Sequence, residues 1–381
     1  PREGLAAAVD VGTTTVVAQL LDLKTGRVLA VCSGMNEQAI HGADIMSRVT
    51  HAAIGGLDEL AGIIRRQVGE MLNTLLEESG ANPTDLKQAA LVGNTVMHHI
   101  FSRLDVSPLA HHPFAPDHLE MQSFTADELG WADGVDNLRV MFLPCLGGFV
   151  GSDILAGVIA TRLHERSSPA ALVDLGTNGE MVVGNRERLL CASTAAGPAF
   201  EGARIAMGMR AATGAIVEVT LQDGHPRCRV LGRTAPRGIC GSGLVDAVAV
   251  GLEMGAVLPN GRLTNGSDFM LSPPVYLTQC DVRELQLAKG AIATGLRILV
   301  ERWGTHLDQL SRVYLAGAFG NYMNLSSAAR IGLLPLRSDQ LEAAGNTALR
   351  GAKLALFQIA NLRKTCASIR SMTEHISLNE D

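Results

Sequence analysis

Two aspartates, each at the end of an apolar segment, are the strongest candidates for chemistry. Asp174 opens the polar stretch Asp174–Glu180, and Asp10 opens the similar stretch Asp10–Thr15 near the start of the chain. Both predict a strand, a tight polar turn and a second strand, with glycines supplying positive φ angles. Such a turn gathers backbone N–H groups, hydroxyls and a carboxylate, as a nucleotide phosphate with Mg²⁺ requires. The repetition predicts a phosphate-binding hairpin in each of two lobes.

The side chains of these turns suggest separate roles. A carboxylate at the end of an apolar strand needs a partner or a function, so Asp10 and Asp174 are expected to hold Mg²⁺ through water. Glu180 would position or activate the attacking water. The alternative is that both aspartates only cap their own turns. The donors expected to contact phosphate are Gly12, Thr13, Thr14, Gly176, Thr177 and Asn178.

Two glycines and a lysine are further candidates. Gly317 and Gly320 follow the apolar segment 313–316 and could let the sugar and base of a nucleotide lie flat against the backbone. A helix start that needs small residues explains them equally well. Lys289 is a lone cation in an apolar helix, where either ligand contact or snorkelling of the side chain would account for it.

Composition excludes several classes of protein. Of the 381 residues, 47% are hydrophobic and 18% are charged, which is typical of a folded chain. A net charge of −6 without a basic block, and 4% aromatic residues, argue against a nucleic-acid partner. No P-loop motif is present, and no apolar run reaches the roughly 18 residues of a membrane span. Seven cysteines without a C-x-x-C pair indicate a reduced, cytoplasmic protein.

The predicted elements repeat along the chain. Three strands, a helix, a strand ending in glycine and a further helix occur twice, and the two glycines are Gly93 and Gly317. Helices between strands imply parallel pairing beyond the first meander, and ligands bind at the carboxyl ends of such strands. The sequence therefore predicts an α/β fold of two similar lobes, with mixed sheets flanked by helices and a nucleotide cleft between the lobes.

The expected bounds are 1–166 for the first lobe, 167–345 for the second, and 346–381 for a carboxy-terminal helix and truncated tail. Within the lobes, 105–137 is expected to be a loop excursion and 212–280 an insertion. Helices are predicted near 198–208, 325–331 and 346–361. Because the chain begins with Pro1 and ends soon after an apolar-polar alternation, we expect it to be a fragment.

These motifs resemble the phosphate and adenosine loops of the actin, Hsp70 and sugar-kinase superfamily, which implies actin-like (ribonuclease H-like) lobes. More specifically, the chain is similar to the carboxy-terminal ATPase part of the reductive activators of corrinoid-dependent enzymes. The matching stretches are Asp10–Thr15, Gly42–Arg48, Val92–Thr95, Asp174–Glu180, Ala196–Gly202, Ile239–Gly243, Leu285–Lys289 and Gly317–Gly320.

The resemblance implies a function in which Co(II) of a corrinoid is returned to Co(I) by one electron, coupled to ATP with Mg²⁺. It also implies that Gly241 and Ser242 contact the nucleotide, and that the partner is a corrinoid protein or corrinoid-dependent methyltransferase. Homodimers are an option. In members of this family, the electron that reduces Co(II) comes from an amino-terminal iron–sulfur domain. No C-x₄-C-x₂-C run is present, so a [2Fe–2S] cluster is expected only in a domain outside this chain.

Three rival functions stay open. A dehydratase-type activator would bridge a [4Fe–4S] cluster between two subunits, with Cys240 and Cys280 as ligands, although two inert cysteines explain the pair as well. A small-molecule kinase of the same superfamily would need an aspartate that activates a sugar hydroxyl, and no such motif is recognisable. The third rival is a non-catalytic, ATP-sensing scaffold.

Overall fold

The computed structural model describes residues 3–42, 44–131, 135, 137–176, 178–264, 266, 268–317 and 323–378. Two predicted site residues, Thr177 and Gly320, lie outside the described residues. The chain divides into two compact units. The first comprises Pro1–Arg166, Asn185–Cys191 and Asn346–Ser377, and the second comprises Ser167–Gly184, Ala192–Gly345 and Leu378–Asp381. These units interleave along the chain, whereas the sequence predicted contiguous lobes, and the predicted lobe bounds stay a prediction.

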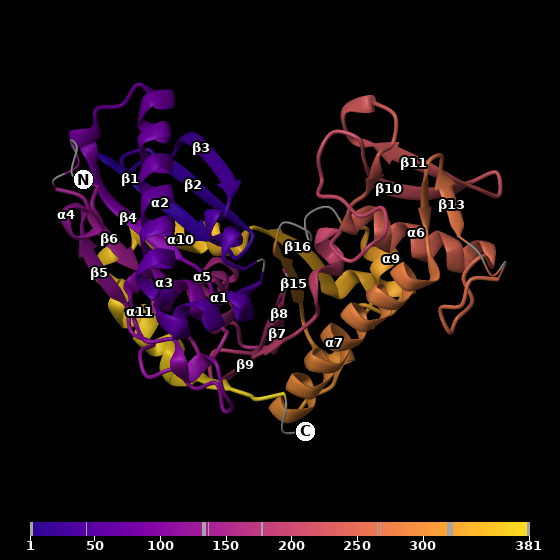
Figure 1. The fold of residues 1–381 in the computed structure, drawn as a ribbon. Coiled ribbons are helices and arrows are strands. Elements are labelled where there is room, and N and C mark those ends of the chain that lie inside the picture. Colours follow the sequence, from indigo (N-terminus) through magenta and orange to yellow (C-terminus); the bar gives the residue numbers. More distant parts are fainter. Residues whose placement is uncertain are drawn as a thin grey trace. The chain divides into compact units, whose positions relative to one another are not determined.

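The first sheet has six strands in the order β3-β2-β1-β4-β6-β5 (Figure 1). They are β1 (Leu5–Val11), β2 (Thr15–Asp22), β3 (Val28–Met35), β4 (Leu86–Val92), β5 (Gln122–Thr125) and β6 (Arg139–Phe142). The first three strands form an antiparallel meander, while β1–β4 and β4–β6 pair in parallel. The sheet is therefore mixed, as the sequence predicted.

The second sheet has the strand order β16-β15-β7-β8-β9-β17. Its strands are β7 (Ala170–Leu175), β8 (Gly179–Gly184), β9 (Leu189–Thr194), β15 (Val313–Ala316), β16 (Leu341–Gly345) and β17 (Thr373–His375). β7 and β8 are antiparallel, whereas β7–β15 and β15–β16 are parallel. The order β9-β8-β7-β15-β16 repeats the order β3-β2-β1-β4-β6 of the first sheet. The prediction of two similar α/β halves is confirmed.

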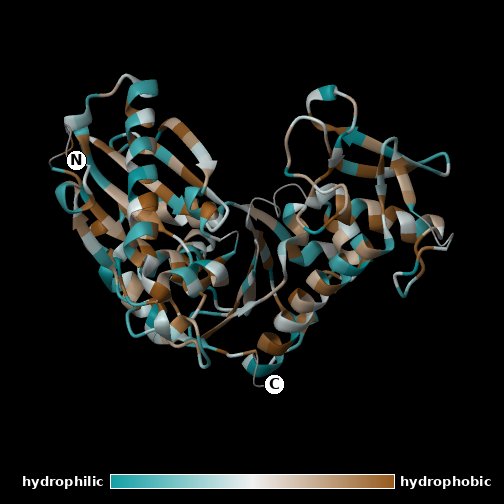
Figure 2. Ribbon diagram, viewed as in Figure 1, coloured by the Kyte–Doolittle hydropathy of each residue, from teal (hydrophilic) through white to brown (hydrophobic). Residues whose placement is uncertain are grey.

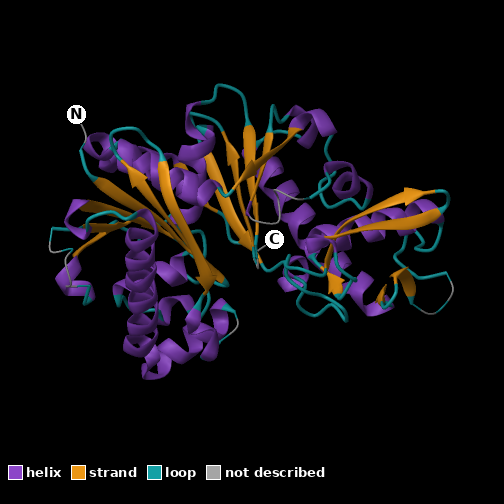
Figure 3. Ribbon diagram, turned by 90° about the horizontal axis from the view of Figure 1, so that it is seen from above, coloured by secondary structure: helices purple, strands orange, loops and turns teal. Residues whose placement is uncertain are grey.

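Helices flank the first sheet on both faces, with α2 and α3 on one and α5 and α10 on the other (Figure 3). In α2, Leu60, Ile64, Val68 and Leu75 recur at helical spacing and are buried in the core against β2 and β3. The helices of this unit are α1 (Ile45–His51), α2 (Leu57–Ser79), α3 (Thr95–Ser102), α4 (Ala126–Leu129), α5 (Ser152–Thr161), α10 (Thr347–Phe357) and α11 (Ile359–Met372).

The helices α5 and α10 occupy equivalent places in the two repeats, after β6 and β16, and they pack directly on each other. The contact is so close that a Cβ atom at Gly351 would lie 2.0 Å from the carbonyl oxygen of Ala156. α10 also packs on β1 and β4. This packing brings the beginning of α10 to the sheet that carries Asp10.

The second unit contains the segment 212–280, and its description as an insertion stays a prediction. A three-stranded sheet and a hairpin are formed by β10 (Ala215–Gln222), β11 (His225–Val230), β12 (Gly238–Ile239), β13 (Phe269–Ser272) and β14 (Val275–Leu277). The α-helices described in this unit are α6 (Gly241–Met254), α7 (Gln279–Trp303) and α9 (Leu325–Arg330). α7 lies against β8 and supports the second hairpin.

Three sequence predictions differ from the structure. The helix expected near 198–208 is only the 3₁₀ turn Pro198–Glu201, because Gly202 adopts a φ of 79° and ends it. The helix expected over 346–361 is two helices, α10 and α11, separated at Gln358. The segment 105–137 is more than a loop, since it contributes β5, α4 and buried side chains such as Leu109 to the core.

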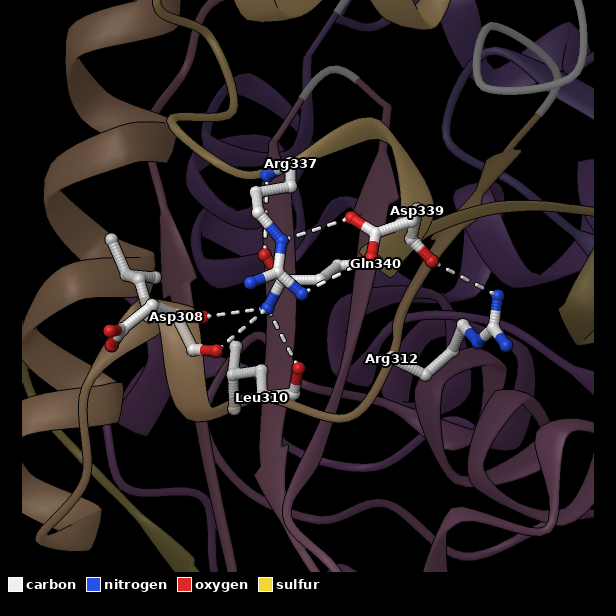
Figure 4. Close-up of polar contacts among 7 residues, drawn as sticks. Asp308, Leu310, Arg312, Arg337, Asp339 and Gln340 are labelled. Carbon is white, nitrogen blue, oxygen red and sulfur yellow. Dashed lines mark hydrogen bonds and ion pairs between the residues drawn. The ribbon is translucent and has the colours of Figure 1, made fainter.

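Gln340 anchors the loops that lead into β15 and β16 (Figure 4). Its buried Nε2 atom donates to the carbonyl oxygens of Leu307 and Leu310, at 3.1 and 2.8 Å. Beside it, the guanidinium of Arg337 forms an ion pair with Asp339 at 3.0 Å. These contacts fix the start of two parallel strands whose far ends lead to Gly317 and Asn346.

The strands of both sheets carry mostly hydrophobic residues (Figure 2). β1, β4 and β7 are buried over most of their length, as expected for central strands covered on both faces. Among the described helices, none combines the length and hydrophobicity that crossing a bilayer would need. A polar side chain at the end of such a strand is therefore conspicuous, and Asp10 and Asp174 both hold this position.

Candidate functional site

The first hairpin joins β1 to β2 at residues 12–14 and carries Asp10 at its base. The Nδ2 atom of Asn346 donates a hydrogen bond of 2.9 Å to Oδ2 of Asp10. Burial raises the pKa of Asp10 to about 6, and the bond from Asn346 opposes that rise. A carboxylate with a raised pKa is one whose negative charge the protein only partly compensates, so it favours a bound cation.

Asn346 was not predicted as a site residue. Its Oδ1 atom caps α10 by accepting a bond of 2.7 Å from the backbone N–H of Leu349, so one amide joins the helix to Asp10. A signal was present in the sequence, because Gly345-Asn346-Thr347 repeats the tripeptide Gly93-Asn94-Thr95. In both places the tripeptide ends a strand and begins a helix.

Asn94 plays the corresponding part beside the turn of the first hairpin. Its Nδ2 atom donates to Oγ1 of Thr13 at 2.9 Å, while its Oδ1 atom caps α3 through the N–H of Met97. On the other side of the turn, Nδ2 of Asn36 donates to the carbonyl oxygen of Gly12 at 2.9 Å. Two asparagines therefore hold the turn from outside it. A Cβ at Gly12 would lie 2.5 Å from the carbonyl oxygen of Thr15, so only glycine fits there.

Three helices of the first unit begin at this edge of the sheet. The backbone N–H of Ser152, at the start of α5, donates to the carbonyl oxygen of Gly93 at 2.9 Å, and the N–H of Gly93 donates to Oγ of Ser152 at 3.1 Å. α3 begins at Asn94 and α10 at Asn346, as described above. Helix N-termini carry partial positive charge, so their convergence favours an anion such as phosphate.

The second hairpin joins β7 to β8 and differs from the first in one respect. Asp174 lies directly opposite Glu180 in the antiparallel pair, so both side chains lie on the same face of the sheet. In the first hairpin the residue opposite Asp10 is Val17. Glu180 is buried, with 8% of its surface exposed. The second hairpin therefore carries one more carboxylate than the first, at the position predicted for a catalytic base.

Gly317 lies directly against Asp174. A Cβ at Gly317 would be 2.7 Å from Oδ1 of Asp174 and 2.8 Å from the carbonyl oxygen of Leu175, and the residue has a φ of 88°. In the first repeat, a Cβ at Gly93 would lie 2.7 Å from the carbonyl oxygen of Val11. Each half thus requires a glycine directly after its fourth strand, because that glycine packs against the carbonyl oxygen of the residue that follows the aspartate. The structure brings Gly317 and Asp174 together, as their shared role in ligand binding would need.

Three other residues that the sequence predicted to contact the nucleotide already make close contacts within the protein. The buried Oγ of Ser242 donates to the carbonyl oxygen of Val217 at 2.8 Å, and a Cβ at Gly241 would lie 1.9 Å from the carbonyl oxygen of Phe200. Lys289 donates from Nζ to the carbonyl oxygen of Ile331 at the end of α9 and lines a cavity of about 610 Å³. These contacts favour packing and helix capping, and their proposed role in nucleotide binding stays a prediction.

Two protein-family models together match nearly the whole chain. Residues 168–381 match the family model described as "C-terminal domain of RACo the ASKHA domain". Residues 5–166 match the model described as "RACo middle region". The boundary between the two matches lies just before β7, where the second repeat begins.

Two curated relatives and one solved structure are similar over nearly the whole chain. "Corrinoid activation enzyme RamQ" of Eubacterium limosum is 34% identical, covering 98% of this chain and 68% of the relative. "[Co(II) methylated amine-specific corrinoid protein] reductase" of Methanosarcina barkeri is 26% identical, covering 97% and 73%. The solved structure is titled "Reductive activator for corrinoid,iron-sulfur protein" and matches with a TM-score of 0.87 and 32% identity. The match covers 98% of this chain. This chain therefore spans just under two thirds (63%) of the length of the chain in that structure.

Proposed function

Since the chain belongs to the RACo family of ASKHA proteins, we propose that it is the ATP-binding and ATP-hydrolysing part of a reductive activator that restores Co(I) from Co(II) in a corrinoid protein. The observation that carries the proposal is the repeated hairpin, with Asp10 and Asp174 at equivalent strand ends. The matched relatives are longer than this chain, and their names refer to corrinoid activation and reduction.

The first hairpin supplies the groups that a triphosphate needs. The donors are the backbone N–H groups of Gly12, Thr13 and Thr14 and the hydroxyls of the two threonines, assisted by the helix N-termini at Asn94 and Ser152. In the second hairpin, Thr177 and Asn178 would have the same role, and Gly176 would join them once its N–H leaves the carbonyl oxygen of Asn178, 3.1 Å away. Mg²⁺, when bound, neutralises phosphate charge. The raised pKa of Asp10 supports Asp10 as one of its carboxylates, with Asp174 as the other.

Glu180 is the proposed base that positions the attacking water. Its place opposite Asp174 and its burial set it apart from exposed carboxylates, and the first hairpin has valine at the equivalent position. Only the second of the two phosphate-binding hairpins would then supply a catalytic carboxylate for ATP hydrolysis. Gly317 would let the sugar and base approach the backbone beside Asp174.

The electron is proposed to come from a reduced [2Fe–2S] cluster in a domain outside this chain. A reduced cluster there would supply one electron to Co(II), which would give Co(I) and leave the cluster oxidised. Reduction to Co(I) is unfavourable for biological donors. A nucleotide-dependent conformational state that alters contact with the corrinoid protein would therefore be the contribution of this chain.

The first test is ATP turnover by the purified chain with Mg²⁺, with and without a corrinoid protein held in the Co(II) state. We expect ATP binding and a turnover that rises several-fold with the Co(II) protein. Steady phosphorylation of a small metabolite would instead support a kinase. Turnover that ignores the corrinoid protein would support a scaffold.

A second test joins the chain to a [2Fe–2S] domain and follows the loss of Co(II) absorption under anaerobic conditions. Reduction should require ATP and should be lost in Asp10→Asn. The dehydratase-type alternative is tested by iron and sulfide analysis of the anaerobically purified chain. Stoichiometric iron that disappears in Cys240→Ala would overturn our proposal. Cys240 is buried and Cys280 exposed.

A further inference from the structure

A second group of possible ligands lies away from the hairpins, where α1 joins α2. His41 follows the 3₁₀ helix Glu37–Ile40, His51 ends α1, and Glu59 lies in the first turn of α2. Among the described residues, these three bring their ligand atoms within 4.8 Å of one another. All three belong to the first unit, and the ATP-dependent function proposed above uses none of them.

The distances match the coordination sphere of a metal ion. His41 Nε2 lies 3.3 Å from Glu59 Oε1, and His51 Nε2 lies 3.0 Å from Glu59 Oε2. Zinc binds nitrogen and oxygen ligands at about 2.0–2.2 Å, so two ligand atoms on a tetrahedral ion are separated by roughly 3.4 Å. The observed separations are already close to this value. Only a small adjustment of the three side chains would admit an ion.

The orientation of the two histidines supports a shared ligand. Their rings are stacked, with centroids 4.4 Å apart and planes inclined by 20°, and both Nε2 atoms approach the same carboxylate. The Nε2 atom of His41 is buried and forms no hydrogen bond, in spite of its short distance to Glu59. A buried ring nitrogen without a hydrogen bond is costly. A metal ion would satisfy it.

The backbone between α1 and α2 makes the arrangement possible. Residues Ala52–Gly56 form a π-helical turn in which Gly55 has a φ of 107°, and such turns often accompany functional sites. A Cβ at Gly56 would lie 2.3 Å from Cδ2 and Nε2 of His51. Glycine at position 56 therefore leaves the space that the His51 ring occupies beside Glu59.

We propose that His41, His51 and Glu59 form a binding site for a divalent ion of the zinc class. Two imidazoles and one carboxylate are a donor set that zinc accepts, whereas Mg²⁺ prefers oxygen ligands. Glu59 is 55% exposed, so water completes the coordination. The ion connects the segment after β3 to the beginning of α2 and so stabilises the kinked junction between α1 and α2.

The test is titration of the tag-free, EDTA-dialysed chain with Zn²⁺ by calorimetry, without nucleotide. We expect one tight site that a hundredfold excess of Mg²⁺ does not occupy, and a rise of the thermal midpoint with Zn²⁺. Glu59→Gln should weaken the site at least 100-fold and abolish the rise, and His51→Gln should do the same. Co²⁺ should give the visible absorption of a four- or five-coordinate ion.

The matched control is Asp58→Asn, which removes the neighbouring carboxylate that pairs with Arg103 at 3.2 Å. This variant should bind Zn²⁺ as the parent chain does. Glu59 is half-exposed, so Glu59→Gln should fold even where His51→Gln does not, and circular dichroism checks this. Absence of a stoichiometric site in the parent chain would overturn the proposal. So would Zn²⁺ binding that is unchanged in Glu59→Gln, which would place the ion on other histidines.

Discussion

The Nδ2 atom of Asn346 donates a hydrogen bond of 2.9 Å to Oδ2 of Asp10, across 336 positions of the chain. Because Asn346 also caps α10, this bond ties the helix of one repeat to the hairpin of the other. Asp10 is half-buried, and desolvation raises its pKa to about 6. The side chain that we expect to hold Mg²⁺ is therefore supported by a neutral amide rather than by a cation, which leaves its charge available to a ligand.

Replacing Asp10 by asparagine should abolish activity and stabilise the fold. The folded pKa of about 6 lies above the ordinary value of 3.8, so the ionised carboxylate destabilises the folded chain at pH 7. Asp10→Asn should add about 3 kcal/mol to the free energy of unfolding and lower ATP turnover at least 100-fold. Urea denaturation and a phosphate-release assay measure the two effects.

The control for this variant is Asp22→Asn. Asp22 is also a half-buried, strand-end aspartate, but its Oδ1 atom accepts hydrogen bonds from the backbone N–H groups of Lys24 and Thr25, at 2.7 and 3.3 Å. These bonds lower its pKa. Asp22→Asn should leave ATP turnover unchanged and should not stabilise the fold. If Asp10→Asn behaved in the same way, Asp10 would be a turn cap and not a ligand of Mg²⁺.

Removing the Asn346 side chain should shift the pH dependence of ATP turnover. Its hydrogen bond lowers the pKa of Asp10, so in Asn346→Ala that pKa rises further and the acidic limb of the pH profile moves to higher pH. Loss of the cap should also cost about 1 kcal/mol of stability. Thr125→Ala removes the cap of α4 without touching Asp10, and should reproduce the stability loss alone. Equal profiles in both variants would contradict the role of Asn346.

The role of Glu180 is separable from nucleotide binding. Glu180→Gln keeps the size of the side chain and removes its basicity, so ATP affinity should change only a few-fold while turnover falls by about 10²–10⁴. Equilibrium binding and single-turnover hydrolysis distinguish the two. Glu187→Gln, in the turn between β8 and β9, is the control and should hydrolyse ATP normally. Normal single-turnover rates in Glu180→Gln would remove Glu180 from the mechanism.

Local structure was largely predictable from the sequence, and long-range contacts were not. The hairpin of Asp10 consists of two apolar strands and a Gly-Thr turn a few residues long, so the local sequence is enough to predict it. Asn346 reaches Asp10 only because α5 and α10 pack together, which no nearby residue reveals. The helix expected near 198–208 failed because Gly202 and Gly208 favour a turn, and their close packing overrides the apolar pattern.

Gly317 is the residue at which a single methyl group should do most damage to the second hairpin. Gly317→Ala combines a φ of 88° with contacts of 2.7 Å to Asp174 Oδ1 and 2.8 Å to the Leu175 carbonyl. Gly255→Ala has a similar φ of 71° but meets nothing within 4 Å. The backbone strain of about 1–2 kcal/mol is common to both variants. Gly317→Ala should therefore be the less stable in urea and should bind ATP more weakly, and equal stability would contradict the packing described here.

Acid should destabilise the first unit through buried histidines. Burial lowers the pKa of His98 to about 3, and its Nε2 atom lies 3.1 Å from the carbonyl oxygen of Glu120. Because the unfolded chain takes up a proton below pH 6.5 and the folded chain does not, stability falls as the pH drops from 6.5 towards 3. Between pH 7 and pH 5, His98 alone should cost about 2 kcal/mol.

The variant His98→Gln keeps an amide that can bond to the Glu120 carbonyl but cannot be protonated. Its free energy of unfolding should fall less between pH 7 and pH 5 than that of the parent chain, by about 2 kcal/mol. Asp10 acts in the opposite direction, because its raised pKa makes the folded state take up a proton as the pH falls through 6. His225→Gln, at an exposed position, should leave the pH dependence unchanged. Urea titrations of the parent chain and the two variants at both pH values measure these differences. Equal losses of unfolding free energy in all three chains would mean that His98 does not set the acid sensitivity.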